Sequence, residues 1–408
     1  MTSTDLADKA ENYLHHLCLE IPNRCVGSAG NRAATDFFAD TVAASGFETE
    51  CPTFDCFDWH HGAVRLTVDD TSFAAFVSPY APGCAVTAPL TVIATIEELA
   101  AAEIADRIIL LHSEIAREQL MPKNFPFYNP ESHQRIIALL EQKRPQAIIA
   151  ATTRNPQLAG AVYPFPLIED GDFDIPSVYI KDVEGERLAA HAGREVSLEF
   201  KADRTPATGC NVIARKGTDF SRRVVLFAHI DAKQGTPGAL DNGTGVVTLL
   251  LLAERLADYS GDLGIEIVAL NGEDYYSAPG EQQWVARNTG RFDEIVLGIN
   301  LDGAGYQHGN TAYSLYDPPP EIAVIIWEVF SGRQNMVEGD PWYQSDHSLF
   351  IQNRRPALAI TSDRFDDLWT RIAHTPDDRP EIVDYAKLVD ISAALLDLLR
   401  RLDGHVEQ

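Results

Sequence analysis

The chain has 408 residues, a formal net charge of -27 and a mean hydropathy of -0.14. Its 45% hydrophobic and 23% charged residues are typical of an ordinary folded protein, which excludes a disordered or fibrous class. The 60 acidic against 33 basic residues argue against nucleic acid as a partner, because phosphate binding needs clustered Lys and Arg.

The N-terminal residues carry acidic side chains where a signal peptide would carry basic ones and then an apolar core. No apolar run in the sequence reaches the length of a membrane span. We therefore expect a cytoplasmic protein without a membrane partner. The six cysteines show neither zinc-finger spacing nor the density of a secreted scaffold, so we expect reduced thiols. The sequence leaves the oligomeric state open, with a homodimer among the options.

The first 59 residues predict two helices, at 5–19 and 31–45, and then a short strand over 47–54. From about residue 60 the pattern changes to short apolar strands separated by turns. This region contains few convergent acids and histidines, which indicates an inserted β-rich domain at 60–203 rather than the catalytic part.

From residue 204 onward, predicted strands and helices alternate, which favours a mixed sheet sandwiched by helices. The predicted strands are 222–228, 265–270, 294–301 and 356–361, and the predicted helices are 244–259, 282–288, 321–331 and 384–401. The expected architecture is therefore an α/β catalytic domain, discontinuous over 1–59 and 204–408, that carries the insertion.

Candidate metal ligands follow the predicted strands of this catalytic domain. Loops beyond the carboxyl ends of the strands build the site in open α/β sheets. The residues that fall at these ends or in the loops after them are His229, Asp231, Asp241, Glu273, Asp274, Asp302 and His374. Two histidines with several carboxylates form a zinc-type ligand set.

A two-metal hydrolase needs one bridging carboxylate, ligands that complete each ion, and a further carboxylate as general base. We assign Asp241 as the bridge and Glu273 as the base. His229 with Asp302 would complete one ion, and Asp274 with His374 the other. Asp231 is too close in sequence to His229 to be an obvious ligand, and we expect it to accept the imidazole N–H.

The motifs around these residues resemble those of the zinc aminopeptidases of peptidase family M28, in that family's order. The motifs are Val-Leu-Phe-Ala-His229-Ile-Asp, Ala-Leu-Asp241-Asn-Gly-Thr-Gly, Asn271-Gly-Glu273-Asp274, Asn300-Leu-Asp302-Gly, Ser345-Asp346-His347-Ser-Leu-Phe and His374-Thr-Pro-Asp-Asp. The likeness covers residues 211 to the C-terminus well and the early segment 24–47 loosely. The insertion is more weakly similar to the protease-associated domain of some members.

Two departures from the family pattern affect the expected site. The family usually has Glu-Glu where this chain has Glu273-Asp274, and the shorter Asp274 would weaken or shift one metal site. The family's Gly-Leu-x-Gly-Ser after this pair is replaced by residues 275–280, Tyr-Tyr-Ser-Ala-Pro-Gly, which reshapes a wall near the substrate.

The resemblance implies an aminopeptidase that hydrolyses N-terminal residues from peptides, using water activated by two zinc ions, with Glu273 as general base. Tyr343 is a weak candidate for a donor to the oxyanion, and His347 is expected to be structural or at the pocket edge. Other divalent metals are not excluded by this ligand set.

Three alternatives stay open at this point. Glutaminyl-peptide cyclotransferase chemistry occurs in the same broad family with one zinc, although the intact His229 favours hydrolysis. A carboxypeptidase or dipeptidase would need an Arg or Lys facing the metals, which the sequence cannot place. The third is a peptidase-like binding protein without catalysis.

Overall fold

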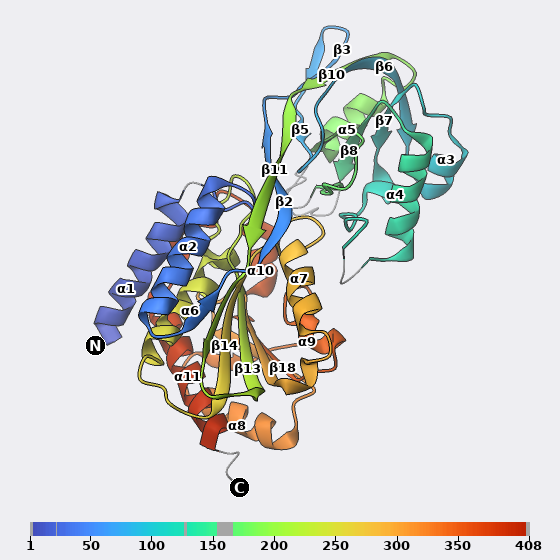
Figure 1. Cartoon of the computed structure of the whole chain (residues 1–408). Coiled ribbons are helices and arrows are strands. Elements are labelled where there is room, and N and C mark those ends of the chain that lie inside the picture. Colours follow the sequence, from blue (N-terminus) through green and yellow to red (C-terminus); the bar gives the residue numbers. More distant parts are fainter. Residues whose placement is uncertain (1–2, 22, 126–128, 153–165, 405–408) are drawn as a thin grey trace. The chain divides into compact units, whose positions relative to one another are not determined.

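A computed structural model describes residues 3–21, 23–125, 129–152 and 166–404 (Figure 1). The chain divides into two compact units, one formed by residues 1–56 with 207–408 and the other by residues 57–206. The boundaries differ by three residues at each end from the predicted insertion at 60–203. Among the described residues, no helix is both long enough and apolar enough to cross a membrane.

The first unit contains an eight-stranded mixed sheet, in the order β1-β12-β14-β13-β15-β18-β16-β17. Its strands are β1 (Glu48–Glu50), β12 (Val212–Lys216), β13 (Asp219–His229), β14 (Leu263–Leu270), β15 (Ile295–Leu301), β16 (Thr311–Tyr316), β17 (Met336–Glu338) and β18 (Ala357–Ser362). The central four, β14-β13-β15-β18, pair in parallel. Their carboxyl ends therefore lie along one edge of the sheet.

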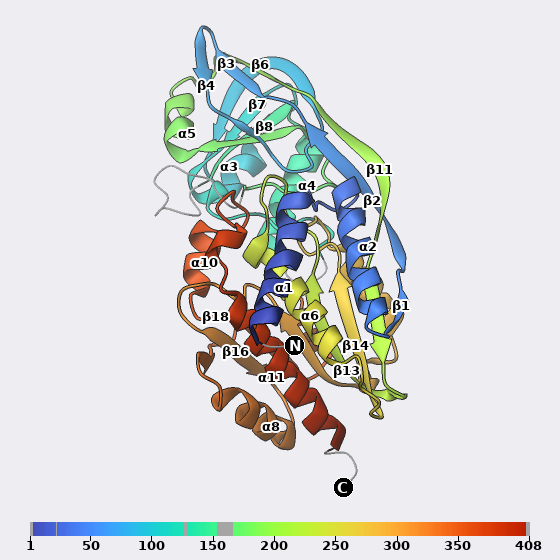
Figure 2. The ribbon, with the colours of Figure 1, turned by 90° about the vertical axis from the view of Figure 1, so that its left-hand side faces the viewer.

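Helices cover both faces of this sheet. They are α1 (Ser3–His15), α2 (Ala29–Ala44), α6 (Thr244–Arg255), α7 (Pro279–Asn288), α8 (Pro320–Ser331), α9 (Ser348–Gln352), α10 (Phe365–Arg371) and α11 (Tyr385–Gly404). Figures 1 and 2 show α1, α2, α6 and α11 together on one side of the sheet, whereas α7 and α9 lie on the other. The predicted mixed α/β sandwich is confirmed.

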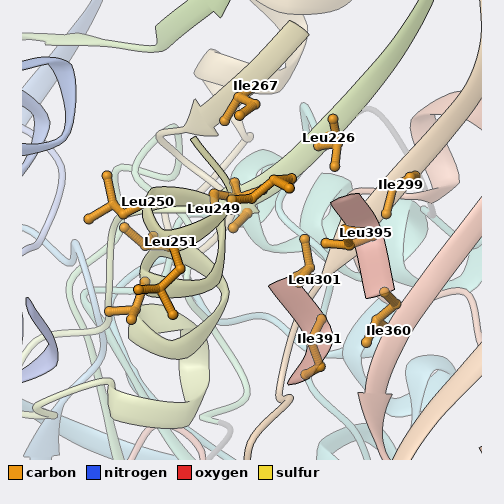
Figure 3. Packing of buried hydrophobic residues seen from close by; sticks show 14 of the residues in the cluster. Leu226, Leu249, Leu250, Leu251, Ile267, Ile299, Leu301, Ile360, Ile391 and Leu395 are labelled. Atoms are coloured by element: carbon orange, nitrogen blue, oxygen red, sulfur yellow. The ribbon is translucent and has the colours of Figure 1, made fainter. Parts of the chain in front are cut away.

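Strand β13 is buried on both faces of the sheet, which explains why its sequence is a continuous apolar run. Leu226 belongs to the core beneath α6 and α11, where Leu249, Leu395 and Ile299 also lie (Figure 3). On the other face, Phe227 stacks on Phe350 of α9 at 4.6 Å between ring centroids. Trp284 of α7 contacts the Phe227 ring edge-on, at 4.8 Å between ring centroids.

The second unit has its own eight-stranded sheet, in the order β4-β3-β10-β6-β7-β8-β9-β5. Its elements are β3 (Arg65–Val68), β4 (Thr71–Phe73), β5 (Phe76–Val77), β6 (Cys84–Ile93), α3 (Ile96–Ala101), β7 (Ile108–Leu111), α4 (Glu131–Lys143), β8 (Ala147–Thr152), β9 (Ser177–Lys181), α5 (Asp182–Ala189) and β10 (Glu195–Phe200). This β-rich sheet is consistent with a protease-associated-like domain, and that assignment stays a prediction.

Some elements differ from the sequence-based expectation. The single strand expected at 47–54 is two strands, because Pro52 interrupts the run between β1 and β2 (Thr53–His61). Strand β2 pairs with β11 (Ala202–Cys210) in a separate two-stranded sheet. Strands β16 and β17 were not predicted, since each is short and lies at or near the sheet edge.

Gly298 of β15 provides a test of the packing beneath α9. A Cβ atom at this position would lie 2.3 Å from the ring of Phe350, which is fully buried between Phe227 and Trp284. We expect Gly298→Ala to lower the free energy of unfolding by about 1–3 kcal/mol through overpacking. Urea denaturation measures this change. Gly332→Ala is the control, because its new Cβ would make only ordinary contact at 3.5 Å and should leave the midpoint unchanged.

Candidate metal centre

The parallel strands bring the predicted ligands to one edge of the sheet. His229 is the last residue of β13, and Asp241 lies in the turn η3 (Ala239–Gly243) directly before α6. Asp274 follows β14, Asp302 follows β15, and His374 comes after β18 and α10. These five residues are separated widely in sequence but meet because the carboxyl ends of parallel strands share an edge.

Asp241 lies between the two histidines. Its Oδ1 is 3.1 Å from Nε2 of His229, and its Oδ2 is 3.1 Å from Nε2 of His374. Both side chains of the His229–Asp241 pair are almost fully buried, at 1% and 5% exposure. Each oxygen of one carboxylate therefore faces a different imidazole, which is the arrangement that a bridging ligand requires.

The other two carboxylates flank this pair. Asp274 Oδ1 is 3.0 Å from Nε2 of His374, and Asp302 Oδ1 is 3.8 Å from Nε2 of His229. The second oxygen of Asp302 accepts a hydrogen bond from the Ser345 hydroxyl at 2.6 Å, and Asn300 donates to that hydroxyl at 2.9 Å. This chain of donors fixes the Asp302 side chain with Oδ1 directed at His229.

The loop that carries Glu273 and Asp274 is fixed through Asp231. The backbone N–H groups of Gly272 and Asp274 donate to the two oxygens of Asp231 at 2.9 and 3.0 Å. The distance from His229 Nδ1 to Asp231 Oδ1 is 3.7 Å, longer than a hydrogen bond. Asp231 thus positions the loop, and its expected role as acceptor of the imidazole N–H stays a prediction.

Glu273 differs from the surrounding acids in its exposure. Its side chain is 19% exposed, and its Oε2 is 4.0 Å from Nε2 of His229. Burial raises the pKa of the Glu273 carboxyl well above its usual value, and although His229 opposes this shift, the charge of Asp274 adds to it. Glu273 therefore lies beside the ligand cluster with access to solvent, where a proton-transfer group would be needed.

The donor atoms fit divalent metal ions of the zinc type. Zinc–ligand bonds of about 2.0–2.2 Å in tetrahedral geometry place neighbouring ligand atoms roughly 3.3 Å apart. The four distances above, 3.0, 3.1, 3.1 and 3.8 Å, are close to that spacing. His229 Nε2, both Asp241 oxygens and Asp302 Oδ1 are buried and make no hydrogen bond to the described residues, as expected of atoms that bind a cation. One ligand atom from each of His229, Asp241 and Asp274 lies within 4.8 Å of the other two, so these three residues could also hold one ion together.

The carboxylates around the histidines perturb the imidazoles strongly. Burial alone would lower the pKa of His374, but Asp274 and Asp241 raise it to about 10. Glu273, Asp231 and Asp241 likewise raise the pKa of His229 well above its usual value, against the effect of burial. This excess of negative charge is what a pair of divalent cations would neutralise.

The family model of peptidase family M28 matches residues 211–399, just under half of the chain, and this range contains all five candidate ligands. Residues 211–399 form a family M28 peptidase domain.

Known proteins extend this likeness beyond the M28 domain. Leucine aminopeptidase 2 of Arthroderma otae is 22% identical over 367 residues, which are 82% of this chain and 68% of that protein. A probable lipoprotein aminopeptidase of Mycobacterium tuberculosis is 25% identical over 307 residues, and these cover 72% of this chain but only 57% of its own length. The structure of a zinc aminopeptidase from Bacillus subtilis superposes with a TM-score of 0.75 at 18% identity, covering 97% of this chain and 95% of that one.

His374 stands in the M28 domain with a left-handed backbone, at a φ of 61°. This conformation costs a non-glycine residue roughly 1–2 kcal/mol, so the surrounding structure must hold it. The Trp369 ring contacts the imidazole edge-on at 5.9 Å between centroids. The free-energy cost of this backbone conformation is consistent with a requirement for the His374 side chain at this position.

The two weak substrate candidates occupy different environments. Tyr343 is 59% exposed, and its ring contacts Tyr316 at 5.5 Å, so it lies at the surface. His347 is fully buried, its Nε2 is 2.6 Å from the Trp342 carbonyl oxygen, and burial lowers its pKa to about 4. His347 is therefore neutral and is engaged in packing, and a role for Tyr343 at the oxyanion stays a prediction.

Two buried residues that position Asp241 were not anticipated. Asp378 accepts hydrogen bonds from the backbone N–H groups of Leu240 and Asp241 at 2.7 and 3.0 Å. Arg24 donates hydrogen bonds to the carbonyl oxygens of Ile230, Pro237 and Gly238. It thereby holds both ends of the loop that runs from His229 to Asp241. Asp378 could have been singled out because it belongs to the motif His374-Thr-Pro-Asp-Asp. Arg24 lies in an early loop, far from Asp241 in the sequence.

Asp378 gives a test of how the bridge is positioned. Asp378→Ala removes both acceptors for the turn that carries Asp241, and we expect zinc affinity to fall by about 10–100-fold. Competition with a chromophoric chelator measures this affinity. The neighbouring Asp377→Ala is the control, because that side chain is 73% exposed and forms an ion pair with Arg379. Equal zinc affinities for both variants would show that Asp378 does not support the metal site.

Proposed function

We propose that this chain is a zinc-dependent aminopeptidase that holds two zinc ions. The observation that carries this proposal is the position of Asp241, whose two oxygens each lie 3.1 Å from a different imidazole nitrogen. His229 and Asp302 would complete one ion, while His374 and Asp274 would complete the other. The M28 peptidase domain and the aminopeptidase relatives support the reaction class.

The bound ions would supply Lewis-acid activation of water and stabilisation of negative charge on the peptide carbonyl oxygen. The protein's own contribution to bond cleavage would come from Glu273. Its carboxylate takes a proton from the attacking water and passes that proton to the leaving amine. Burial raises the pKa of the Glu273 carboxyl above its usual value, which is the direction that suits a group that must hold a proton between the two steps.

Substitution of the base tests the reaction. Glu273→Gln keeps the size of the side chain but cannot accept the proton, so we expect kcat on aminoacyl anilides to fall about 10²–10⁴-fold. Zinc content by elemental analysis should match the unsubstituted protein, since Glu273 is not a proposed ligand. A chelator should abolish the activity of the unsubstituted enzyme and added zinc should restore it. Ordinary turnover by the zinc-loaded variant would exclude Glu273 as the base.

The bridging role of Asp241 makes a separate prediction about metal content. The zinc-loaded chain should contain about two zinc ions, because a shared carboxylate holds both. Asp241→Ala should remove both ions, whereas Asp302→Ala should remove only the ion that His229 binds. Elemental analysis after gel filtration measures the ratio of zinc to protein. Loss of one ion in both variants would mean that Asp241 serves a single metal.

A further inference from the structure

Two of the cysteines lie next to each other in the first unit. Cys51 follows β1, shortly before the chain leaves this unit at Cys56, and Cys210 ends β11, shortly after the chain returns at Ala207. The two thiols form a hydrogen bond with each other. Cys51 is exposed and Cys210 is half-buried. The proposed peptidase reaction gives this pair of thiols no task.

The strand pairing explains why these two thiols meet. Strands β1 and β12 pair in antiparallel fashion. The two chain segments stay side by side beyond this ladder, since the N–H of Asn211 donates to the Pro52 carbonyl oxygen at 3.2 Å. Cys51 directly precedes Pro52, and Cys210 directly precedes Asn211. The two cysteines are therefore diagonal neighbours on adjacent antiparallel segments.

The backbone at this point can adjust to a covalent link. A disulfide needs Cα atoms about 4.4–6.8 Å apart, whereas diagonal neighbours in a regular ladder are about 7–8 Å apart. Residues 51, 52 and 211 lie outside the regular strands, because Pro52 has no N–H to donate to a ladder. At this interruption the two segments can approach each other without breaking the pairing of β1 with β12.

We propose that Cys51 and Cys210 form a reversible disulfide when the protein meets a low-molecular-weight disulfide. The thiolate of Cys51, the more exposed of the two, attacks one sulfur of the reagent, and the other sulfur leaves as a thiol. The Cys210 thiolate then attacks Sγ of Cys51 and releases the second reagent thiol. The protein thus gives up two protons and two electrons, which reduce one reagent disulfide to two thiols. This inference does not depend on the proposed peptidase activity.

The link would join the two segments of the first unit and stabilise the folded chain. It closes a loop that contains the whole second unit, residues 57–206, and closing a long loop removes conformations from the unfolded chain. The carbonyl oxygen of Cys210 also accepts a hydrogen bond from the Asn271 side chain at 3.0 Å. Because Asn271 stands two residues before Glu273, the link would strengthen a support of the loop that carries the proposed base.

The surroundings of the two thiols make the reaction dependent on pH. Burial raises the pKa of Cys51, and the neighbouring Cys210, Asp36 and Glu50 raise it further. Burial and the charge of Asp36 also raise the pKa of Cys210, against the effect of a hydrogen bond with Thr35. Because the thiolate is the attacking species, the rate should rise about tenfold for each pH unit below the pKa.

Disulfide mapping tests the proposal on the full-length protein. The protein is incubated with glutathione disulfide, quenched with acid and analysed by mass spectrometry of its unreduced peptides. We expect a link between Cys51 and Cys210 that forms about tenfold faster at pH 8 than at pH 7 and is reversed by dithiothreitol. In Cys210→Ser the reaction should stop at the mixed disulfide of Cys51 with glutathione. Cys84→Ser is the control, because that thiol donates to the Leu198 carbonyl oxygen in the second unit, and it should leave the link unchanged.

Thermal unfolding measures the stabilisation. The oxidised unsubstituted protein should unfold about 5–10 °C above the reduced one, whereas oxidation should leave the Tm of Cys51→Ser unchanged. Accumulation of glutathione on Cys51 of the unsubstituted protein without the link, or a link from Cys51 to a different cysteine, would overturn the proposal. A link between Cys51 and Cys210 without a rise in Tm would reject its stabilising role.

Discussion

Asp231, Asp241, Asp274 and Asp302 are each at most 4% exposed, so four carboxylates repel one another with little water between them. This charge raises the pKa of the two buried imidazoles, although burial alone would lower it. The chain instead surrounds the acids with fixed donors, such as the N–H groups that bind Asp231 and the Ser345 hydroxyl that binds Asp302. These donors hold the oxygens at the spacing of metal ligands, and the remaining negative charge favours the binding of divalent cations.

No candidate ligand comes from the described residues of the N-terminal segment, yet this segment supports the loops that carry the ligands. Asn31 of α2 and Asn271, two residues before Glu273, exchange side-chain hydrogen bonds at 2.8 and 2.9 Å. Asn211, just before β12, accepts from the Asn271 backbone at 3.0 Å. A buried network with every member partnered is rigid, because each unsatisfied group would cost free energy. The two sequence segments that form the first unit are therefore joined by hydrogen bonds next to the candidate metal site.

The sequence allowed the ligand cluster to be predicted because parallel strands impose a rule that does not depend on the loops. Three buried parallel strands, β13, β14 and β15, with a histidine or carboxylate at or just beyond their ends must bring those groups together. His374 was predicted from its place in the loop between the last predicted strand and the last helix, although α10 and a left-handed backbone separate it from β18. Arg24 and Asn31 could not be predicted as supports. Their hydrogen bonds reach 206 and 240 residues along the chain, and such pairings leave no local pattern.

The aspartate at position 274, where the family pattern has glutamate, still reaches the cluster of candidate ligands. The shorter carboxylate still lies 3.0 Å from His374 Nε2, because Asp231 fixes the backbone N–H of Asp274 and so sets where its side chain begins. A side chain shorter by one methylene group occupies less of the site, and the Lys233 ammonium stands 3.8 Å from its Oδ1. The hydrogen bond that Asp231 accepts from the Asp274 backbone therefore keeps the shorter carboxylate at ligand spacing from His374.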